Sequence, residues 1–132
     1  MKKVTIEYCI DGYNIIEKDV VNLFDQLNEI EKETNNIFKA PFGVDVVISG
    51  IGRISIGLAA QTVLCYISDD YETQLTAVGD INAQGETMFY FGDYALMSNK
   101  YLIPFNSGVE IVNEWIKDGI LPMRVDWTEE LF

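Results

Sequence analysis

Apolar and polar residues alternate along several short stretches of this chain, with the two-residue period of a β-strand. The first stretch carries Val4, Ile6 and Tyr8 and ends at the turn sequence Ile10-Asp11-Gly12. Further strands are expected over residues 44–49, 54–58, 62–68, 74–78 and 87–91. The connections between them are short and rich in glycine and aspartate, which favours hairpins over crossover helices. The sequence therefore predicts a mostly antiparallel sheet.

A helical period of 3.6 residues occurs in two other segments. The first is expected to begin at Asp19, a suitable N-cap residue, and to end near Glu33, with residues 34–43 forming a loop. Its apolar positions share one face: Val20, Leu23, Phe24, Leu27 and Ile30.

The second helical segment lies near the C-terminus. Ser107 and Glu110 have the spacing of a capping box, which predicts a helix that begins near Gly108. Its apolar face consists of Val109, Ile111, Val112, Trp115 and Ile116. Two helices with one apolar face each must pack on the sheet, so the expected fold class is α+β.

Gly119 suits the left-handed position after this helix, and Pro122 prevents its continuation. Met123, Val125 and Trp127 then alternate with polar residues, which predicts a short final strand. Trp127 is interpreted as a core residue, with a place on a binding surface as the alternative.

The C-terminal stretch also carries a motif of the form I-P-x7-V-x-x-[aromatic]-x-x-x-G-x-x-P-x-x-V-x-W. Its residues are Ile103, Pro104, Val112, Trp115, Gly119, Pro122, Val125 and Trp127. The motif resembles the C-terminal signature of immunity-protein family one of bacterial polymorphic toxin systems, whose partners are often deaminase-type toxins. The resemblance implies an immunity protein that binds a toxin domain. It assigns the signature residues a structural role and transfers no functional residue upstream of Tyr101.

The charge of the chain points to the chemistry of a partner. The chain has twenty-one acidic and nine basic residues, which gives a net charge of −12. No basic residue lies between Arg53 and Lys100. Nucleic acid requires a basic surface, so it is not expected as a direct ligand. A basic protein fits better, bound by an acidic, tyrosine-flanked region. The candidate partner-binding residues are Tyr66, Asp69, Asp70, Tyr71, Glu72, Asp93 and Tyr94.

Catalytic and metal-binding motifs are incomplete. The chain has no histidine, which removes the commonest general base and metal ligand. The order of Gly52, Ser55 and Gly57 does not match a nucleophile elbow, and these glycines fit hairpin turns better. The segment 80–85 resembles the start of a calcium loop, but Phe91 occupies the position of its last ligand. No catalytic residue, metal or cofactor is expected.

The cysteines, the hydropathy of the chain and the aromatic residues indicate its cellular compartment and its core. Cys9 and Cys65 match no metal or redox spacing and are expected to be reduced, with a disulfide disfavoured. No segment has the length and hydropathy of a membrane span, and no secretory leader pattern is present, so a cytoplasmic protein of one domain, residues 1–132, is expected. Phe24, Phe89, Phe91 and Trp115 are expected in the core, whereas Tyr101 is a candidate surface residue.

The function predicted from the sequence is an immunity protein, not an enzyme, that binds and occludes a toxin acting on nucleic acid, such as a deaminase. Two alternatives remain open. One is an acidic ligand-binding or scaffold domain whose charge serves solubility. The other is a hydrolase that uses only carboxylates.

Overall fold

The computed structural model describes residues 2–130. Within this range lie the helices α1 (Leu23–Thr34) and α2 (Phe105–Asp118) and the 3-10 helix η1 (Asn99–Tyr101). The strands are β1 (Val4–Tyr8), β2 (Ile16–Asp19), β3 (Gly43–Ile48), β4 (Gly52–Gly57), β5 (Gln61–Thr62), β6 (Leu64–Ser68), β7 (Gln74–Ala77), β8 (Glu86–Tyr90), β9 (Tyr94–Ser98), β10 (Ile103–Pro104) and β11 (Trp127–Thr128). The predicted α+β class is confirmed.

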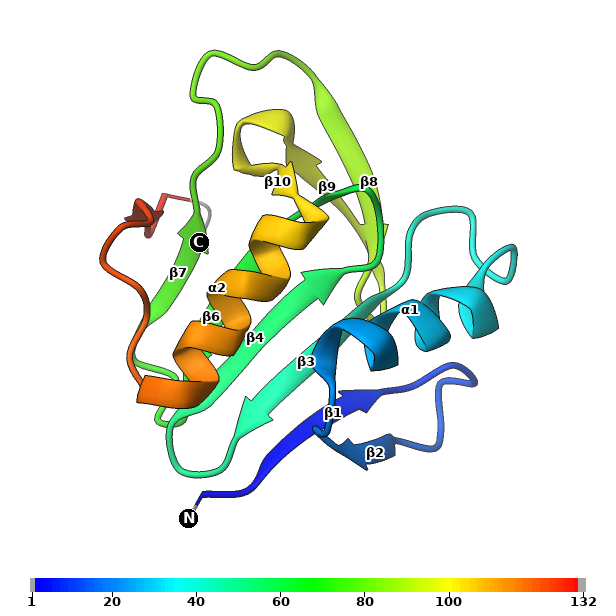
Figure 1. The fold of residues 1–132 in the computed structure, drawn as a ribbon. Coiled ribbons are helices and arrows are strands. Elements are labelled where there is room, and N and C mark those ends of the chain that lie inside the picture. The colour runs from blue at the N-terminus through cyan, green and yellow to red at the C-terminus, as the bar shows by residue number, and fades with distance from the viewer. Residues whose placement is uncertain (1, 131–132) are drawn as a thin grey trace.

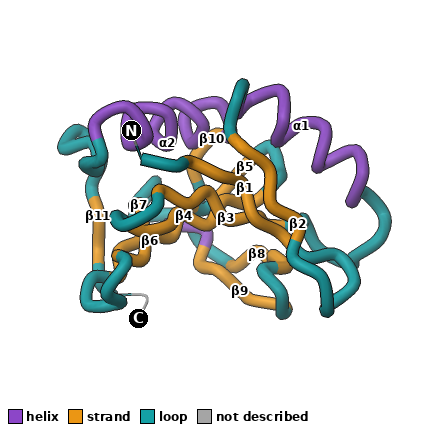
Figure 2. Tube along the Cα trace, turned by 90° about the horizontal axis from the view of Figure 1, so that it is seen from below, coloured by secondary structure: helices purple, strands orange, loops and turns teal. Residues whose placement is uncertain are grey.

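The main sheet has the strand order β11-β7-β6-β4-β3-β1-β2, and all its neighbouring strands are antiparallel. Both α-helices lie across one face of this sheet (Figure 1). The hairpin formed by β8 and β9 lies on the opposite face, as the view along the sheet shows (Figure 2). The molecule therefore has three layers, of which the third covers only part of the sheet.

The helix side of the main sheet forms the larger core. Alternate residues of β3 and β4, such as Val46, Ile54 and Ile56, point to this side and are fully buried. They meet the apolar faces of α1 and α2, where the side chain of Trp115 is also fully buried. The predicted apolar faces of the helices are thus buried at most positions, with Phe24 exposed and Val20 and Ile116 partly buried.

The start of α2 differs from the prediction. The helix begins at Phe105, its N-cap residue is Pro104, and no side chain caps its first turn, so the expected Ser107–Glu110 capping box is wrong. Pro104 has φ −57° and Phe105 donates its N–H to the carbonyl of Ala60. The fixed φ of proline and this bond to the neighbouring loop start the helix before Ser107 can cap it.

The start of α1 is also later than predicted. Asp19 is the last residue of β2, an unexpected strand that pairs with β1, and Asn22 is the N-cap. The Asn22 side chain accepts a hydrogen bond from the Asp25 N–H at 3.1 Å. Pairing with β1 extends residues 16–19, which removes Asp19 from the helix. Helix α1 therefore presents Phe24 to solvent, 42% exposed, and its assignment to the core is wrong.

The C-terminal segment confirms part of its prediction. Gly119 has φ 72° and ends α2 in the left-handed conformation. The expected strand over residues 123–127 is reduced to β11, which pairs with β7, and Met123 is 96% exposed. Trp127 packs partly buried against the larger core, and its indole N–H donates to the Pro122 carbonyl at 3.2 Å.

Two further expectations need correction. Residues 62–68 do not form one strand, because Val63 separates β5, which pairs with β10, from β6 in the main sheet. Tyr101 is 4% exposed and packs in the smaller core between the main sheet and the β8–β9 hairpin, so it is not a surface residue. Strand β9 was not predicted, and its pairing with β8 creates this second core.

Two glycines allow the hairpin to approach the sheet. Gly43 and Gly57 are directly opposite each other in β3 and β4, and both are buried beneath the hairpin's aromatic rings. A Cβ atom on Gly57 would lie 2.5 Å from the Phe89 ring, and one on Gly43 would overlap the ring of Phe91. Gly57 is therefore a strand residue that makes room for the hairpin, whereas the sequence assigned it to a turn.

We expect Trp115→Ala to lower the free energy of unfolding by about 3–5 kcal/mol, because it leaves a large cavity under α2. Trp127→Ala should cost less, since that ring is only partly buried. The matched control is Met123→Ala at an exposed position, with a change within about 0.5 kcal/mol. Urea denaturation measures all three, and equal costs for Trp115→Ala and Met123→Ala would contradict the core assignment.

We expect Gly57→Ala to destabilise the protein by about 1–3 kcal/mol, because the added methyl group collides with Phe89. Combining it with Phe89→Leu should recover part of that cost, since a smaller side chain relieves the collision. A double-mutant cycle by denaturation measures this coupling. Additive effects of the two substitutions would show that the hairpin does not depend on this close approach.

Candidate functional site

The first group of predicted partner-binding residues lies in the turn between β6 and β7. Asp70 accepts hydrogen bonds from the Ser68 hydroxyl at 2.6 Å and the Glu72 N–H at 3.0 Å. These bonds hold the pKa of Asp70 below its usual value, because they stabilise the carboxylate. Asp69 and Glu72 are exposed, and Tyr71 has φ 62° with a side chain 68% exposed. Asp70 thus builds the turn that displays its three neighbours.

The second group lies at the tip of the β8–β9 hairpin. The Asp93 carboxylate accepts the Tyr94 N–H at 2.8 Å. The Tyr94 ring is 46% exposed and meets Tyr90 edge-on at 5.0 Å between centroids. Its hydroxyl accepts the Lys39 N–H at 3.4 Å. The tip therefore presents one anchored aromatic ring beside an exposed acid.

These two groups do not share one surface. The β6–β7 turn lies beside the turn between β3 and β4, since Asp69 donates its N–H to the Ile51 carbonyl. The hairpin tip lies beside the start of β3, since Tyr90 donates its N–H to the Pro41 carbonyl. The length of β3, Gly43–Ile48, separates the two sites by roughly 20 Å. The predicted partner-binding residues therefore form two separate clusters, one at each end of β3.

Tyr66 belongs to neither group. Its ring faces the helix side of the main sheet and packs edge-on against Trp115, with 5.9 Å between centroids. Its hydroxyl donates to the Ile51 carbonyl at 3.5 Å, and burial raises the pKa of the phenol. The structure thus gives Tyr66 a packing role under α2 instead of the predicted surface position.

The hairpin exposes a face that the sequence did not reveal. Residues with even numbers in β8 and β9 alternate with the buried Phe89 and Met97 and point away from the main sheet, except Tyr90, which stacks on Phe38 and Phe42. Among them, Met88 is 39% and Leu96 is 53% exposed, and they are directly opposite each other. The exposed alternation in YALMS could have indicated this face, but only the pairing with β8 shows which side is covered.

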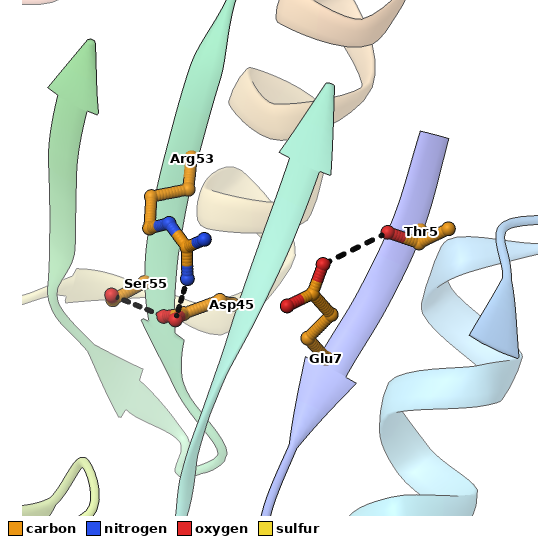
Figure 3. A network of polar contacts seen from close by, with 5 residues as sticks. All are labelled: Thr5, Glu7, Asp45, Arg53 and Ser55. Carbon is orange, nitrogen blue, oxygen red and sulfur yellow. Dashed lines mark hydrogen bonds and ion pairs between the residues drawn. The ribbon is translucent and has the colours of Figure 1, made fainter. Parts of the chain in front are cut away.

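A polar row crosses the hairpin side of the main sheet (Figure 3). The Asp45 carboxylate accepts hydrogen bonds from Arg53 at 2.8 Å and from the Ser55 hydroxyl at 2.5 Å. Glu7 lies in register beside Asp45 on β1. The signal was present in the sequence, because Asp45, Arg53 and Ser55 occupy the polar positions of otherwise apolar strands. Their convergence required the register of β3 and β4.

A pocket of about 190 Å³ lies beside this row and is lined by Glu7, Cys9, Asp45, Arg53 and Phe91, among others. Both Asp45 oxygens are engaged by Arg53 and Ser55, so the carboxylate links β3 to β4. Within residues 2–130, no three metal-ligating side chains converge. The arrangement links the neighbouring strands β3 and β4.

A second pocket of about 380 Å³ opens between the two helices and the loop after β4. Phe24, Leu58 and Phe105 form part of its wall, and Asn28 and Glu31 add polar atoms. The exposed ring of Phe24 belongs to this groove, where it lies 6.2 Å from the ring of Phe105.

Cys65 shares the hairpin side of the sheet with this polar row. Both cysteines are free thiols. Burial raises the pKa of Cys65 to about 11, because the thiolate loses solvation there. Cys9 lies after β1, and its thiol donates to the Asp11 carboxylate at 3.6 Å.

The part of the chain that the structure describes contains no helix long and apolar enough to cross a membrane. No protein-family model matches the chain, and no curated protein matches it either.

We expect Cys65 to react with a disulfide reagent at least about tenfold more slowly than Cys9 at pH 8. With a pKa of about 11, roughly one Cys65 thiol in a thousand is ionised at that pH. The single-thiol variants Cys9→Ser and Cys65→Ser allow each rate to be measured separately. In denaturant the two rates should converge, and equal rates in the folded state would contradict the raised pKa of Cys65.

Proposed function

We propose that this chain is a cytoplasmic immunity protein that binds and occludes a basic toxin domain acting on nucleic acid. The observation that supports the proposal best is the exposure of every acidic residue in the segment between Arg53 and Lys100, which contains no basic residue. All six acids between Arg53 and Lys100 are exposed: Asp69, Asp70, Glu72, Asp80, Glu86 and Asp93. Tyr71 and Tyr94 are exposed among them.

The physical basis is a division of roles between charge and aromatic contact. Exposed acids raise the rate of association with a basic partner, and salt screens much of that effect. Desolvated anchors such as tyrosine slow dissociation. An affinity of about 10⁻⁹ M would allow the protein to compete with the substrate of a toxin inside the cell. Occlusion of a cationic cleft requires no chemistry from the immunity protein.

The resemblance of the C-terminal motif supports the same class. Within the structure, Trp115 and Gly119 serve packing and helix termination, and Pro122 and Trp127 share a hydrogen bond. These roles agree with a structural signature that leaves recognition to other parts of the chain. The proposal therefore assigns toxin binding to the β6–β7 turn or to the hairpin.

The test measures binding to the toxin domain encoded by the neighbouring reading frame. We expect Asp69→Lys/Glu72→Lys to slow association about threefold to tenfold at low salt, and the hairpin variant Glu86→Lys/Tyr94→Ala to slow association less and to speed dissociation. The binding kinetics should change for the variant at the end of the molecule, turn or hairpin, that contacts the toxin. Asp70 is kept in both variants, because it holds the turn.

The control for the turn variant is Glu29→Lys/Glu110→Lys, which makes the same change in net charge at exposed positions on the helices. Kinetics at two ionic strengths and survival of cells that express the toxin give the readouts. Failure of the unaltered protein to bind or protect would refute the proposal. Equal effects of the turn variant and this control would indicate long-range charge only.

A further inference from the structure

Strand β9 is an open edge of the hairpin. Phe91 donates its N–H to the Asp93 carbonyl at the tip, and Asn99 donates to the Gly85 carbonyl at the other end. Bonded and non-bonded pairs alternate in an antiparallel ladder, so the pairs Phe89–Ala95 and Thr87–Met97 are bonded. Leu96 and Ser98 consequently direct their N–H and C=O groups away from β8.

Within residues 2–130, no backbone group outside the hairpin pairs with the N–H or C=O of Leu96 or with the N–H of Ser98, whereas the Ser98 carbonyl lies at the start of η1. Figure 2 shows β9 at the outer margin of the molecule, with no other described segment beyond it. The outer edge of β8 differs, because residues Pro41 and Phe42 pair with Tyr90 there. An additional strand could therefore add to β9 without displacing any part of the chain.

The sequence of β9 lacks the features that protect an edge. Its five residues, YALMS, include no charge, and Leu96 and Tyr94 are about half exposed. The edge strand β2 of the main sheet has the sequence IEKD, in which three of four residues are charged. Natural proteins place charges on edge strands to prevent unwanted pairing. An uncharged, apolar edge in so acidic a chain points to a binding role.

The surroundings of β9 determine the charge of its partner. Glu86 and Asp93 lie at the two ends of the hairpin and are exposed. The hairpin itself contains no basic residue; Lys39 lies beside its tip, and Lys100, which follows β9, pairs with Glu130 at 3.9 Å. A second copy of this chain would bring another net charge of −12 to the same edge, which opposes self-pairing. A basic segment is attracted instead.

We infer that β9 binds an extended basic segment of a partner as a third strand of the hairpin. The partner's backbone pairs with the outward N–H and C=O groups of Leu96 and with the N–H of Ser98. Its apolar side chains cover Leu96, the outward-facing apolar residue on the β9 edge, and its lysine or arginine residues approach Glu86 and Asp93. The inference rests on the proposed function for the source of this segment, which would be the toxin domain.

The test compares three substitutions in the full chain. Leu96→Pro removes one outward N–H and leaves the β8–β9 ladder bonds in place, so binding should weaken at least about tenfold. Leu96→Lys adds a charge at the edge. Met88→Lys adds the same charge directly opposite on the same face, away from the β9 edge, and is the matched control. Proton spectra and melting curves verify that each variant is folded.

Amide exchange followed by nuclear magnetic resonance gives the direct readout. In the free protein, the Leu96 and Ser98 amides should exchange rapidly, whereas those of Ala95 and Met97 should be protected. Two probes are added separately: the neighbouring toxin domain and a synthetic peptide in which valine and lysine alternate. A peptide of alternating valine and glutamate is the control. Binding should slow exchange at Leu96 and Ser98 at least about tenfold.

The outcomes separate this inference from the proposed function. If the toxin binds but leaves the Leu96 and Ser98 amides unprotected, strand addition at β9 is refuted and the proposed immunity function stands. If the basic peptide protects these amides but the toxin does not bind, the result supports strand addition at β9 and counts against the immunity function. Equal weakening by Leu96→Lys and Met88→Lys, with no effect of Leu96→Pro, would indicate contact with the face only. If protection of these amides in the free protein increases with protein concentration, β9 pairs with a second copy of the chain, and the inference of a basic partner is refuted.

Discussion

The close contact between the hairpin and the main sheet is the constraint on which the outer surface of this protein depends. Each strand of the sheet has an apolar side toward the helices and a more polar side opposite. The second side carries the Asp45–Arg53–Ser55 network, which does not favour an apolar cover. Only at Gly43 and Gly57 does the backbone leave room for Phe89 and Phe91. The hairpin is therefore fixed at one end of that face.

This placement determines what the rest of the acidic stretch can do. With Phe89 turned into the smaller core, Met88 faces outward, and pairing across the hairpin places Leu96 beside it. The β6–β7 turn remains at the other end of the sheet, supported by Asp70 and the Ile51 carbonyl. The protein thus offers two acidic surfaces with different characters. One is a polar turn with an exposed tyrosine, and the other is a sheet edge with apolar side chains.

The larger core imposes a different requirement on the chain. Trp115 and the apolar faces of both helices must cover the sheet, and their burial supplies most of the hydrophobic stabilisation of that side. The left-handed turn at Gly119 then directs the chain toward β11, whose pairing with β7 closes one edge of the sheet. The motif residues at the C-terminus therefore stabilise the fold.

The sequence by itself determined the fold class, most strand positions, the apolar helix faces and the glycine that ends α2. These features depend on local periodicity and on backbone preferences, which neighbouring residues express directly. The tertiary structure decided the features that depend on distant partners. Pairing with β1 made residues 16–19 a strand, and the bond to Ala60 started α2 at Phe105. Strand register assembled the polar row and separated Asp69 from Tyr94, because contacts between strands are not encoded in the spacing along one strand.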